Sequence, residues 1–143
     1  IKDFNQKFNI MILVTGSSGF IGSNLIQYLK KKKKSFYGID LKQNKYLKFE
    51  NFAKVDISSL RSVHNFFKKK KPSTVIHLAA ISGVNVCHQN QDLAFRNNVL
   101  ATYNILSASK KYDCKKVLIA SSFAVDKFST NPNYYALTKK ICE

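Results

Sequence analysis

Three glycines near the start of the chain separate an all-apolar segment from an amphipathic one. Residues 10–14 are all apolar, a run that is typical of a strand buried on both faces. The turn TGSSGFIG follows, and residues 20–34 then place apolar side chains at helical spacing, at Ile21, Leu25, Ile26 and Leu29. A buried strand, a glycine turn and a helix in direct succession restrict the chain to folds that are built from strand–helix units.

The rest of the chain repeats this alternation. We expect further strands at residues 35–40, 52–55, 74–79 and 116–121. We expect further helices at residues 59–71, 92–112 and from 133 onward. Such an alternation predicts an α/β fold, namely a Rossmann-type doubly wound parallel sheet with five strands and with helices on both faces.

The glycine turn has the composition of a phosphate-binding loop. Glycine permits a tight turn and lets a diphosphate approach the backbone, whose free N–H groups at the helix start then face its negative charge. Asp40 lies at the end of the second predicted strand, where a carboxylate accepts hydrogen bonds from the hydroxyls of an adenosine ribose. A glycine-rich turn beside a surface aspartate is the alternative, but the order of these elements favours a dinucleotide site.

The net charge of +16 raises a different alternative, a protein that binds a polyanion. All but two of the 24 basic residues, Arg61 and Arg96, are lysine, although arginine is the better bidentate ligand of phosphate. The lysines cluster at residues 30–34 and 68–71, where each run closes a predicted helix and complements the negative end of its dipole. We therefore favour solvated helix ends and expect no nucleic-acid partner.

No apolar run approaches the roughly 18 residues of a membrane span, so we expect no membrane partner either. The three cysteines lie far apart in the sequence and are odd in number, which favours reduced thiols in a cytoplasmic protein, at Cys87, Cys114 and Cys142. The pair Cys87–His88 has no further ligand nearby in the sequence, so we expect no metal site. His77 ends a buried strand, and we interpret it as a packed histidine.

Six motifs follow one another along the chain, namely TGSSGFIGSNL, Asp56–Ile57, HLAA from His77, Asn98 in the long helix, the Ser121–Ser122 pair and a Tyr-x-x-x-Lys. In this order they resemble the extended short-chain dehydrogenase/reductase family, the NAD-dependent epimerase/dehydratase group that acts mostly on nucleotide sugars. The resemblance covers residues 11–143 and implies NAD as the cofactor and a nucleotide sugar as the substrate. The residues that it implies for cofactor binding are Gly16, Gly19, Phe20, Ile21, Gly22, Asp40, Asp56, Ile57, Leu78, Ala79, Ala80, Asn98, Tyr135 and Lys139.

The resemblance also implies an enzyme whose catalytic residues are Ser122, Tyr135 and Lys139. Tyr135 would be the general acid/base, Lys139 would favour its phenolate form and bind the nicotinamide ribose, and Ser122 would donate a hydrogen bond to the substrate oxygen. Tyr134 lacks a lysine four residues on, where Thr138 stands. An exposed pair at this spacing contributes only about 0.2–0.5 kcal/mol, so the lysine needs a cleft in which water is scarce.

The chain departs from the family pattern after Ser122. The family usually continues with Val-Tyr-Gly and a long substrate-facing loop, whereas this chain has Val125-Asp126-Lys127. Sugar 4,6-dehydratases usually carry an Asp-Glu pair directly after the active-site threonine, and this chain has Phe123-Ala124. Because no carboxylate stands there to protonate a leaving hydroxyl, we favour an epimerase or a dehydrogenase/reductase over a dehydratase.

Two other classes of protein stay open. One is a non-catalytic dinucleotide-binding regulator on the same fold, against which the complete catalytic set argues, and the less favoured one is the basic polyanion binder. We interpret residues 1–10 as an extension, and the unfinished helix at Glu143 as the end of a fragment. Such a fragment is expected to aggregate and to be inactive alone, because its fifth strand would lie unpaired at an edge. A homodimer of the full-length protein stays open as well.

Overall fold

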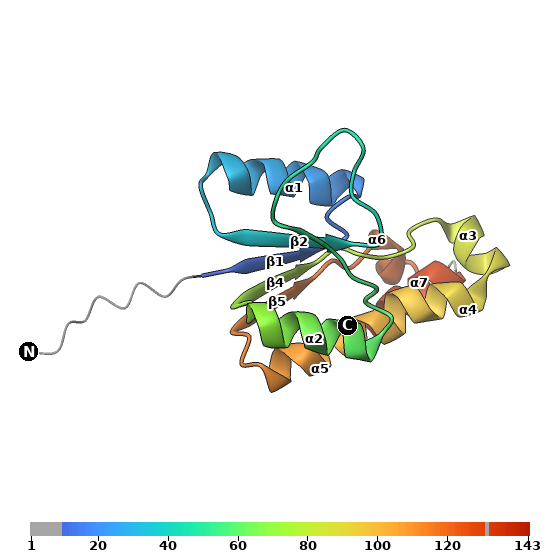
Figure 1. Ribbon diagram of the computed structural model, residues 1–143. Helices are drawn as coiled ribbons and strands as arrows, with labels where there is room; N and C mark the ends of the chain where they lie inside the picture. The colour runs from blue at the N-terminus through green and yellow to red at the C-terminus, as the bar shows by residue number, and fades with distance from the viewer. Residues whose placement is uncertain (1–9, 131) are drawn as a thin grey trace, which may run out of the picture.

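The computed structural model describes residues 10–130 and 132–143 as a five-stranded parallel sheet with helices on both faces (Figure 1). The order of the strands across the sheet is β3-β2-β1-β4-β5. Their bounds are β1 Ile12–Thr15, β2 Phe36–Asp40, β3 Phe52–Lys54, β4 Thr74–His77 and β5 Lys116–Ile119. The predicted doubly wound α/β fold is therefore confirmed. The expected extension lies outside the described residues except for Ile10, which is exposed.

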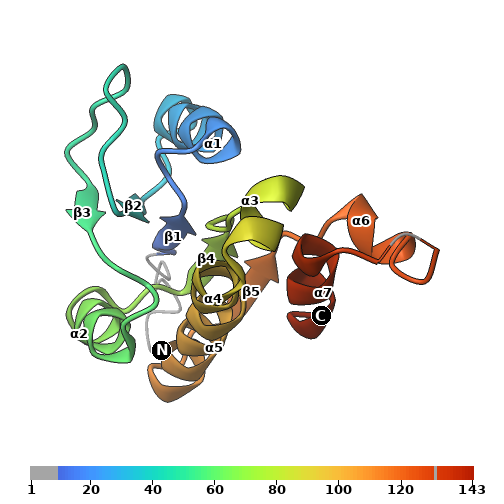
Figure 2. The ribbon, with the colours of Figure 1, turned by 90° about the vertical axis from the view of Figure 1, so that its right-hand side faces the viewer.

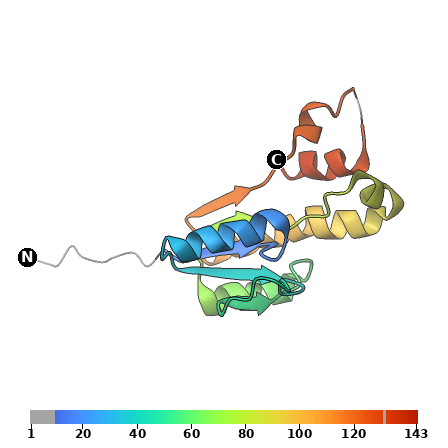
Figure 3. The same ribbon diagram turned by 90° about the horizontal axis from the view of Figure 1, so that it is seen from above.

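Helix α1 (Phe20–Lys31) covers one face of the sheet, and helices α2 (Leu60–Lys70) and α5 (Ala101–Lys111) cover the other (Figures 1 and 2). The remaining helical segments lie toward the carboxyl ends of the strands (Figure 3). They are α3 Val84–Gln89, α4 Gln91–Ala94, the π-helix η1 Phe95–Leu100, α6 Phe123–Asp126 and α7 Tyr134–Ile141. No helix in the described ranges is both long and apolar enough to span a bilayer.

The two sides of the sheet carry separate apolar cores because neighbouring residues of a strand point to opposite faces. Leu13 of β1 packs with Val75, Phe67 and Ile105 on the side of α2 and α5. The next residue along β1 packs on the side of α1, in a cluster of Val14, Ile26, Leu29, Phe36 and Phe49. Both neighbours of β1 pair with it in parallel, so β1 is buried from all sides, as its apolar sequence predicts.

The order of the strands places a crevice beside β1. From β1 the chain passes through α1 to β2 on one side, and it later enters β4 on the other side through α2. The connection after β1 thus leads toward β2, whereas the connection after β4 leads away from β1 toward β5, so the two connections diverge at the neighbouring carboxyl ends of β1 and β4. In open α/β sheets a ligand binds at such a switch point.

Several elements end earlier than the sequence predicts. Strand β4 ends at His77 and not at residue 79, because the N–H groups of Leu78 and Ala79 donate to the Thr15 side chain, both at 3.2 Å. Strand β5 ends at Ile119 instead of residue 121. Helix α1 ends three residues early because Lys33 adopts a left-handed conformation with φ of 52°.

The predicted long helix runs from Gln91 to Lys111, and its middle is a π-helix that the sequence pattern did not indicate. The short helices α3 and α6 were not predicted. Helix α7 ends at Ile141, where the N–H of Cys142 donates to the Lys139 carbonyl at 3.1 Å and the N–H of Glu143 donates to the Lys140 carbonyl at 3.3 Å. The lysines do lie in the last turns of α1 and α2, as the helix-end interpretation expects.

Candidate active site

Two glycines of the turn after β1 are required by close backbone contacts. Gly16 has φ of +66°, and a Cβ atom there would lie 2.7 Å from the backbone nitrogen of Ala79. A Cβ atom on Gly22 would lie 2.1 Å from the carbonyl oxygen of Gly16. Gly16 thus lets the turn rest against the end of β4, and Gly22 lets α1 rest against the turn.

Gly19 has a different environment. Its φ of −72° and ψ of 175° are open to any residue, and the nearest atom to an added Cβ would be the Gly16 carbonyl oxygen, at 3.3 Å. Gly19 is the N-cap of α1 and provides no side-chain hydrogen bond to the first turn. The helix therefore begins with N–H groups that no capping side chain covers, which is the arrangement that binds a phosphate.

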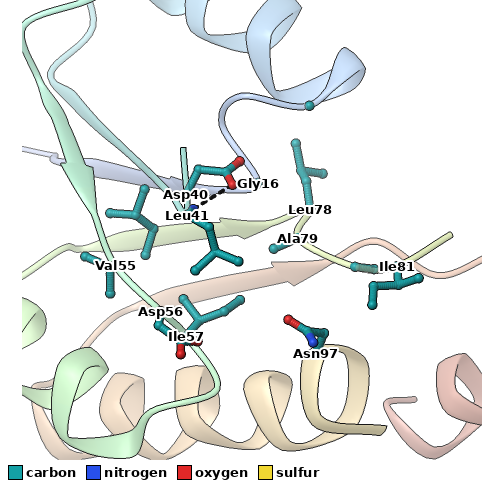
Figure 4. A pocket seen from close by; sticks show the side chains of 13 residues that line it. Gly16, Asp40, Leu41, Val55, Asp56, Ile57, Leu78, Ala79, Ile81 and Asn97 are labelled. Atoms are coloured by element: carbon teal, nitrogen blue, oxygen red, sulfur yellow. Dashed lines mark hydrogen bonds between the residues drawn. The ribbon is translucent and has the colours of Figure 1, made fainter. Parts of the chain in front are cut away.

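A cavity of about 250 Å³ opens beside this turn, at the switch point of the sheet (Figure 4). One wall is the glycine turn, and Asp40 with the segment after β3 forms another. The segment after β4 completes it, and Asn97 points toward it from η1. The lining residues are Gly16, Gly19, Ile39, Asp40, Leu41, Val55, Asp56, Ile57, Leu78, Ala79, Ala80, Ile81 and Asn97.

Asp40 joins the second strand to the glycine turn. Its Oδ2 accepts a hydrogen bond of 3.0 Å from the Ser18 N–H, and its Oδ1 accepts one of 2.7 Å from the Leu41 N–H. The loop after β2 also folds back on the turn, because the Asn44 side chain donates to the Ser18 carbonyl at 3.1 Å. A carboxylate accepts about four hydrogen bonds, so Asp40 keeps acceptor sites for a ribose.

Eight of the residues proposed for cofactor binding line the cavity, namely Gly16, Gly19, Asp40, Asp56, Ile57, Leu78, Ala79 and Ala80. The others lie elsewhere in the described structure. Phe20 and Ile21 are exposed in the first turn of α1, at 86% and 65%, and Gly22 is buried behind the turn. The wall also contains residues that the sequence reasoning missed, at Ile39, Leu41, Val55, Ile81 and Asn97.

The two neighbouring asparagines in η1 contact different parts of the molecule. Asn97 lines the cavity, whereas Asn98 is 2% exposed and bonds to the chain after β4. The Asn98 side chain accepts from the Ile81 N–H at 2.8 Å and donates to the Ile81 carbonyl at 3.1 Å. It also donates to the Thr138 hydroxyl at 3.0 Å, which connects this segment to α7. The doublet Asn-Asn was visible in the sequence, but the choice between its members depends on the π-helical turn.

The predicted catalytic residues lie next to this region, on α6 and α7. Ser122 caps α6, and its Oγ accepts a hydrogen bond from the Ala124 N–H at 3.2 Å. Tyr135 is half-buried on α7, and Lys139 is 6% exposed one turn later. None of the three is among the residues that line the described cavity. Lys139 instead lines a second cavity, together with Ser121 and residues of β5.

Burial changes the electrostatics of Lys139 and His77. Burial lowers the pKa of Lys139, while the neighbouring Cys142 and Glu143 act in the opposite direction. Burial also lowers the pKa of His77 to about 4, and the positive charge of Lys139 contributes to that decrease. His77 is therefore neutral at physiological pH, in agreement with its interpretation as a packed histidine.

This pKa predicts an acid-dependent loss of stability. The unfolded chain takes up a proton on this histidine near pH 6.5 and the folded chain only near pH 4. The neutral His77 thus contributes its full share of the free energy of unfolding above pH 6.5. That share, about 3 kcal/mol, is lost as the pH falls toward 4. Denaturant unfolding of the full-length protein at several pH values should show this slope, and His77→Gln should remove it. Substitution of the exposed His88 is the control and should leave the pH dependence of the free energy of unfolding unchanged. An unchanged pH dependence in His77→Gln would contradict its assignment to His77.

Within the described residues, no group of three or more His, Cys, Asp or Glu side chains is arranged to hold a metal ion. The three cysteines are free thiols in the structure.

The NAD dependent epimerase/dehydratase family model matches residues 12–136. The chain belongs to this family. The resemblance seen in its motifs is thereby confirmed, and so is NAD as the cofactor that members of the family use. Eight residues that the resemblance assigns to that cofactor are among those that line the cavity at the switch point.

The chain is similar to part of several longer proteins. A UDP-glucuronate 4-epimerase of Thermodesulfobacterium geofontis is 31% identical over 92% of this chain and 48% of its own length. A dTDP-glucose 4,6-dehydratase of Haemophilus influenzae is 38% identical over 71% of this chain and 33% of its own. The UDP-glucose 4-epimerase of Thermus thermophilus, solved with NAD, has a TM-score of 0.81 and 27% identity over 92% of this chain and 48% of that one. The chain spans less than half the length of these proteins.

Proposed function

We propose that the full-length protein is an NAD-dependent epimerase or dehydrogenase/reductase that acts on a nucleotide sugar. The observation that carries the proposal is the cavity at the switch point, with the uncapped start of α1 and the Asp40 carboxylate on its walls. Helix α7, which bears Tyr135 and Lys139, is bonded to the same region through Asn98 and Ile81. A dinucleotide site and a candidate acid/base pair thus lie on connected elements.

The residues of the cavity fit the parts of the cofactor. The backbone of the glycine turn would hold the diphosphate, and Asp40 would accept from the adenosine ribose. Asp56 and Ile57 would lie beside the adenine, and the segment after β4 would border the nicotinamide half. When bound, oxidised NAD can accept a hydride from a carbinol carbon, and reduced NAD can return one to a carbonyl carbon.

The roles of the side chains follow from their environments. Tyr135 would take the proton of the sugar hydroxyl during oxidation and return it during reduction. Lys139 is buried, and its positive charge therefore acts more strongly on its neighbours than it would in water. The pKa of His77, which this charge helps to lower, shows the effect. The Ser122 oxygen already accepts from Ala124, which leaves its O–H free to donate to a substrate oxygen.

The choice of reaction rests on the residues after Ser122. Phe123 and Ala124 occupy the first turn of α6, and Phe123 is 71% exposed. The nearest carboxylate along the chain is Asp126, which is exposed at the end of the same helix. A dehydratase needs an acid close to the leaving hydroxyl, and this segment offers none at the positions where the family usually has it. The relatives named as 4-epimerases and 4,6-dehydratases support a nucleotide sugar as the substrate class.

The test is to incubate the full-length protein with NAD and a panel of UDP- and dTDP-hexoses, and to identify the products by NMR. We expect an epimerised or an oxidised sugar. A 4-keto-6-deoxy product would contradict the choice of reaction. A protein that binds NAD but converts no nucleotide sugar would favour the non-catalytic regulator, and DNA affinity without NAD binding would favour the polyanion binder.

A further inference from the structure

A line of buried hydrogen bonds crosses the molecule through His77. The ring is 2% exposed, and both of its nitrogens have partners on other elements. Its Nδ1 lies 2.6 Å from the hydroxyl of Thr15 at the end of β1. Its Nε2 lies 3.0 Å from the hydroxyl of Thr102 in α5. The histidine therefore joins the strand that leads into the glycine turn to the long helix on one face of the sheet.

The neighbouring bonds determine the direction of each hydrogen bond. The Thr15 oxygen accepts from the N–H groups of Leu78 and Ala79, so its own proton donates to Nδ1 of His77. The Thr102 hydroxyl donates to the Asn98 carbonyl at 2.5 Å, so its oxygen accepts from Nε2–H of His77. The arrangement requires a neutral ring with the proton on Nε2, and burial keeps the ring neutral by lowering its pKa to about 4.

The line reaches the cavity at one end and α7 at the other. Leu78 and Ala79, which donate to Thr15, line the cavity. Asn98 donates to Thr138, and the Cys142 thiol donates to the Asn98 carbonyl at 3.4 Å. Thr138 lies directly before Lys139 and donates to the Tyr135 carbonyl at 2.7 Å. Each link from the cavity wall to the helix with the candidate acid/base pair is thus a buried or half-buried hydrogen bond.

We propose that His77 is a positioning residue, which holds α7 and its Tyr135 and Lys139 in register with the wall of the cofactor cavity through Thr102 and Asn98. The proposal rests on the proposed function for its effect on turnover, but its effect on α7 does not depend on that function. A histidine that only filled space would need neither Thr15 nor Thr102 as a hydroxyl partner. Valine in place of Thr102 would then at most cost stability, as any unpaired buried group does, but would leave the exchange of the α7 amides and kcat unchanged.

The test replaces Thr102 by valine and, as the matched control, by serine in the full-length protein. Valine keeps the shape and removes both the acceptor of Nε2–H and the donor to the Asn98 carbonyl, whereas serine keeps the hydroxyl. We expect kcat to fall about tenfold or more in Thr102→Val, since small misplacements of reacting groups have effects of this size. The dissociation constant of NAD should change less than about threefold, and Thr102→Ser should recover most of kcat.

Hydrogen exchange gives a second readout that needs no substrate. In Thr102→Val the amides of α7 should exchange about tenfold faster or more, while those of α1 stay as in the unchanged protein. If Thr102→Val does not fold, Thr138→Val cuts the same line at its α7 end, with Thr138→Ser as its control, and the same pattern is expected. Normal kcat and normal α7 exchange in the valine variant would overturn the proposal. So would a serine variant that is no better than valine.

Discussion

Replacing Tyr135 by phenylalanine in the full-length protein should lower turnover about 10²–10⁴-fold, because the substitution removes only the phenolic oxygen of the proposed acid/base. The ring keeps its half-buried place on α7, so the fold and NAD binding should persist. The measurement is the rate of product formation at saturating substrate, with NAD affinity determined on the same preparation. A variant that retains more than a few per cent of the rate would show that another group moves the proton.

The neighbouring Tyr134 is the matched control. It lines a different, open depression with Arg96 and Asp92, and the residue four beyond it is Thr138. Tyr134→Phe makes the same chemical change on the same helix turn, so its turnover should stay within about threefold of the unchanged protein. Equal losses in the two variants would point to a disturbed helix and not to a lost proton-transfer group.

Replacing Gly22 by alanine should lower the free energy of unfolding by at least about 3 kcal/mol and should abolish NAD binding. The added Cβ would lie 2.1 Å from the Gly16 carbonyl oxygen and 2.8 Å from the Ser17 Cα, and neither backbone atom can move without displacing the turn from β4. Denaturant unfolding measures the first effect and calorimetric titration the second.

Gly19→Ala should weaken NAD binding while it leaves the fold stable. Its extended backbone accepts a side chain and its nearest contact is 3.3 Å, so stability should stay within about 1 kcal/mol. The added methyl group would stand at the mouth of the cavity where a diphosphate approaches, and NAD affinity should fall about tenfold or more. If both variants were equally unstable, or if Gly19→Ala bound NAD normally, the different roles assigned to the two glycines would be wrong.

The fold was predictable from the sequence because its signals are local. The apolar run before the glycines, the helical spacing after them and the alternation that follows do not depend on distant contacts. The end of β4, which was predicted wrongly, does depend on such a contact. Leu78 and Ala79 read as strand residues, yet their N–H groups bond to the Thr15 hydroxyl, a partner more than sixty residues away in sequence.

The cavity was predictable in part, for the same reason. The turn and Asp40 carry recognisable residue types at fixed spacing, and both line the cavity. The sequence pointed to Asn98 and not to Asn97 because nothing in it indicates the π-helical turn, which contains no proline or glycine. That turn directs the two neighbouring asparagines to different contacts. Phe20 and Ile21 were proposed as cofactor residues from their place in the motif. Their side chains are exposed because of the direction in which α1 leaves the turn, and the sequence does not show that direction.

We expect the cavity beside Asp40 to bind NAD in preference to NADP. The 2′-phosphate of NADP would bring about two negative charges toward a carboxylate, and each like-charge pair at about 4 Å costs up to roughly 4 kcal/mol before screening. Lys42 and Lys45 lie in the loop that Asn44 ties to the turn, but both are exposed, so we expect the repulsion to dominate.

Calorimetric titration of the full-length protein, freed of bound nucleotide, with NAD and with NADP compares the affinities of the two cofactors. NAD should bind at least about tenfold more tightly at physiological salt, and Asp40→Ala should narrow the difference. Equal affinities, or a preference for NADP, would contradict the assignment of Asp40 and of the cavity that it lines.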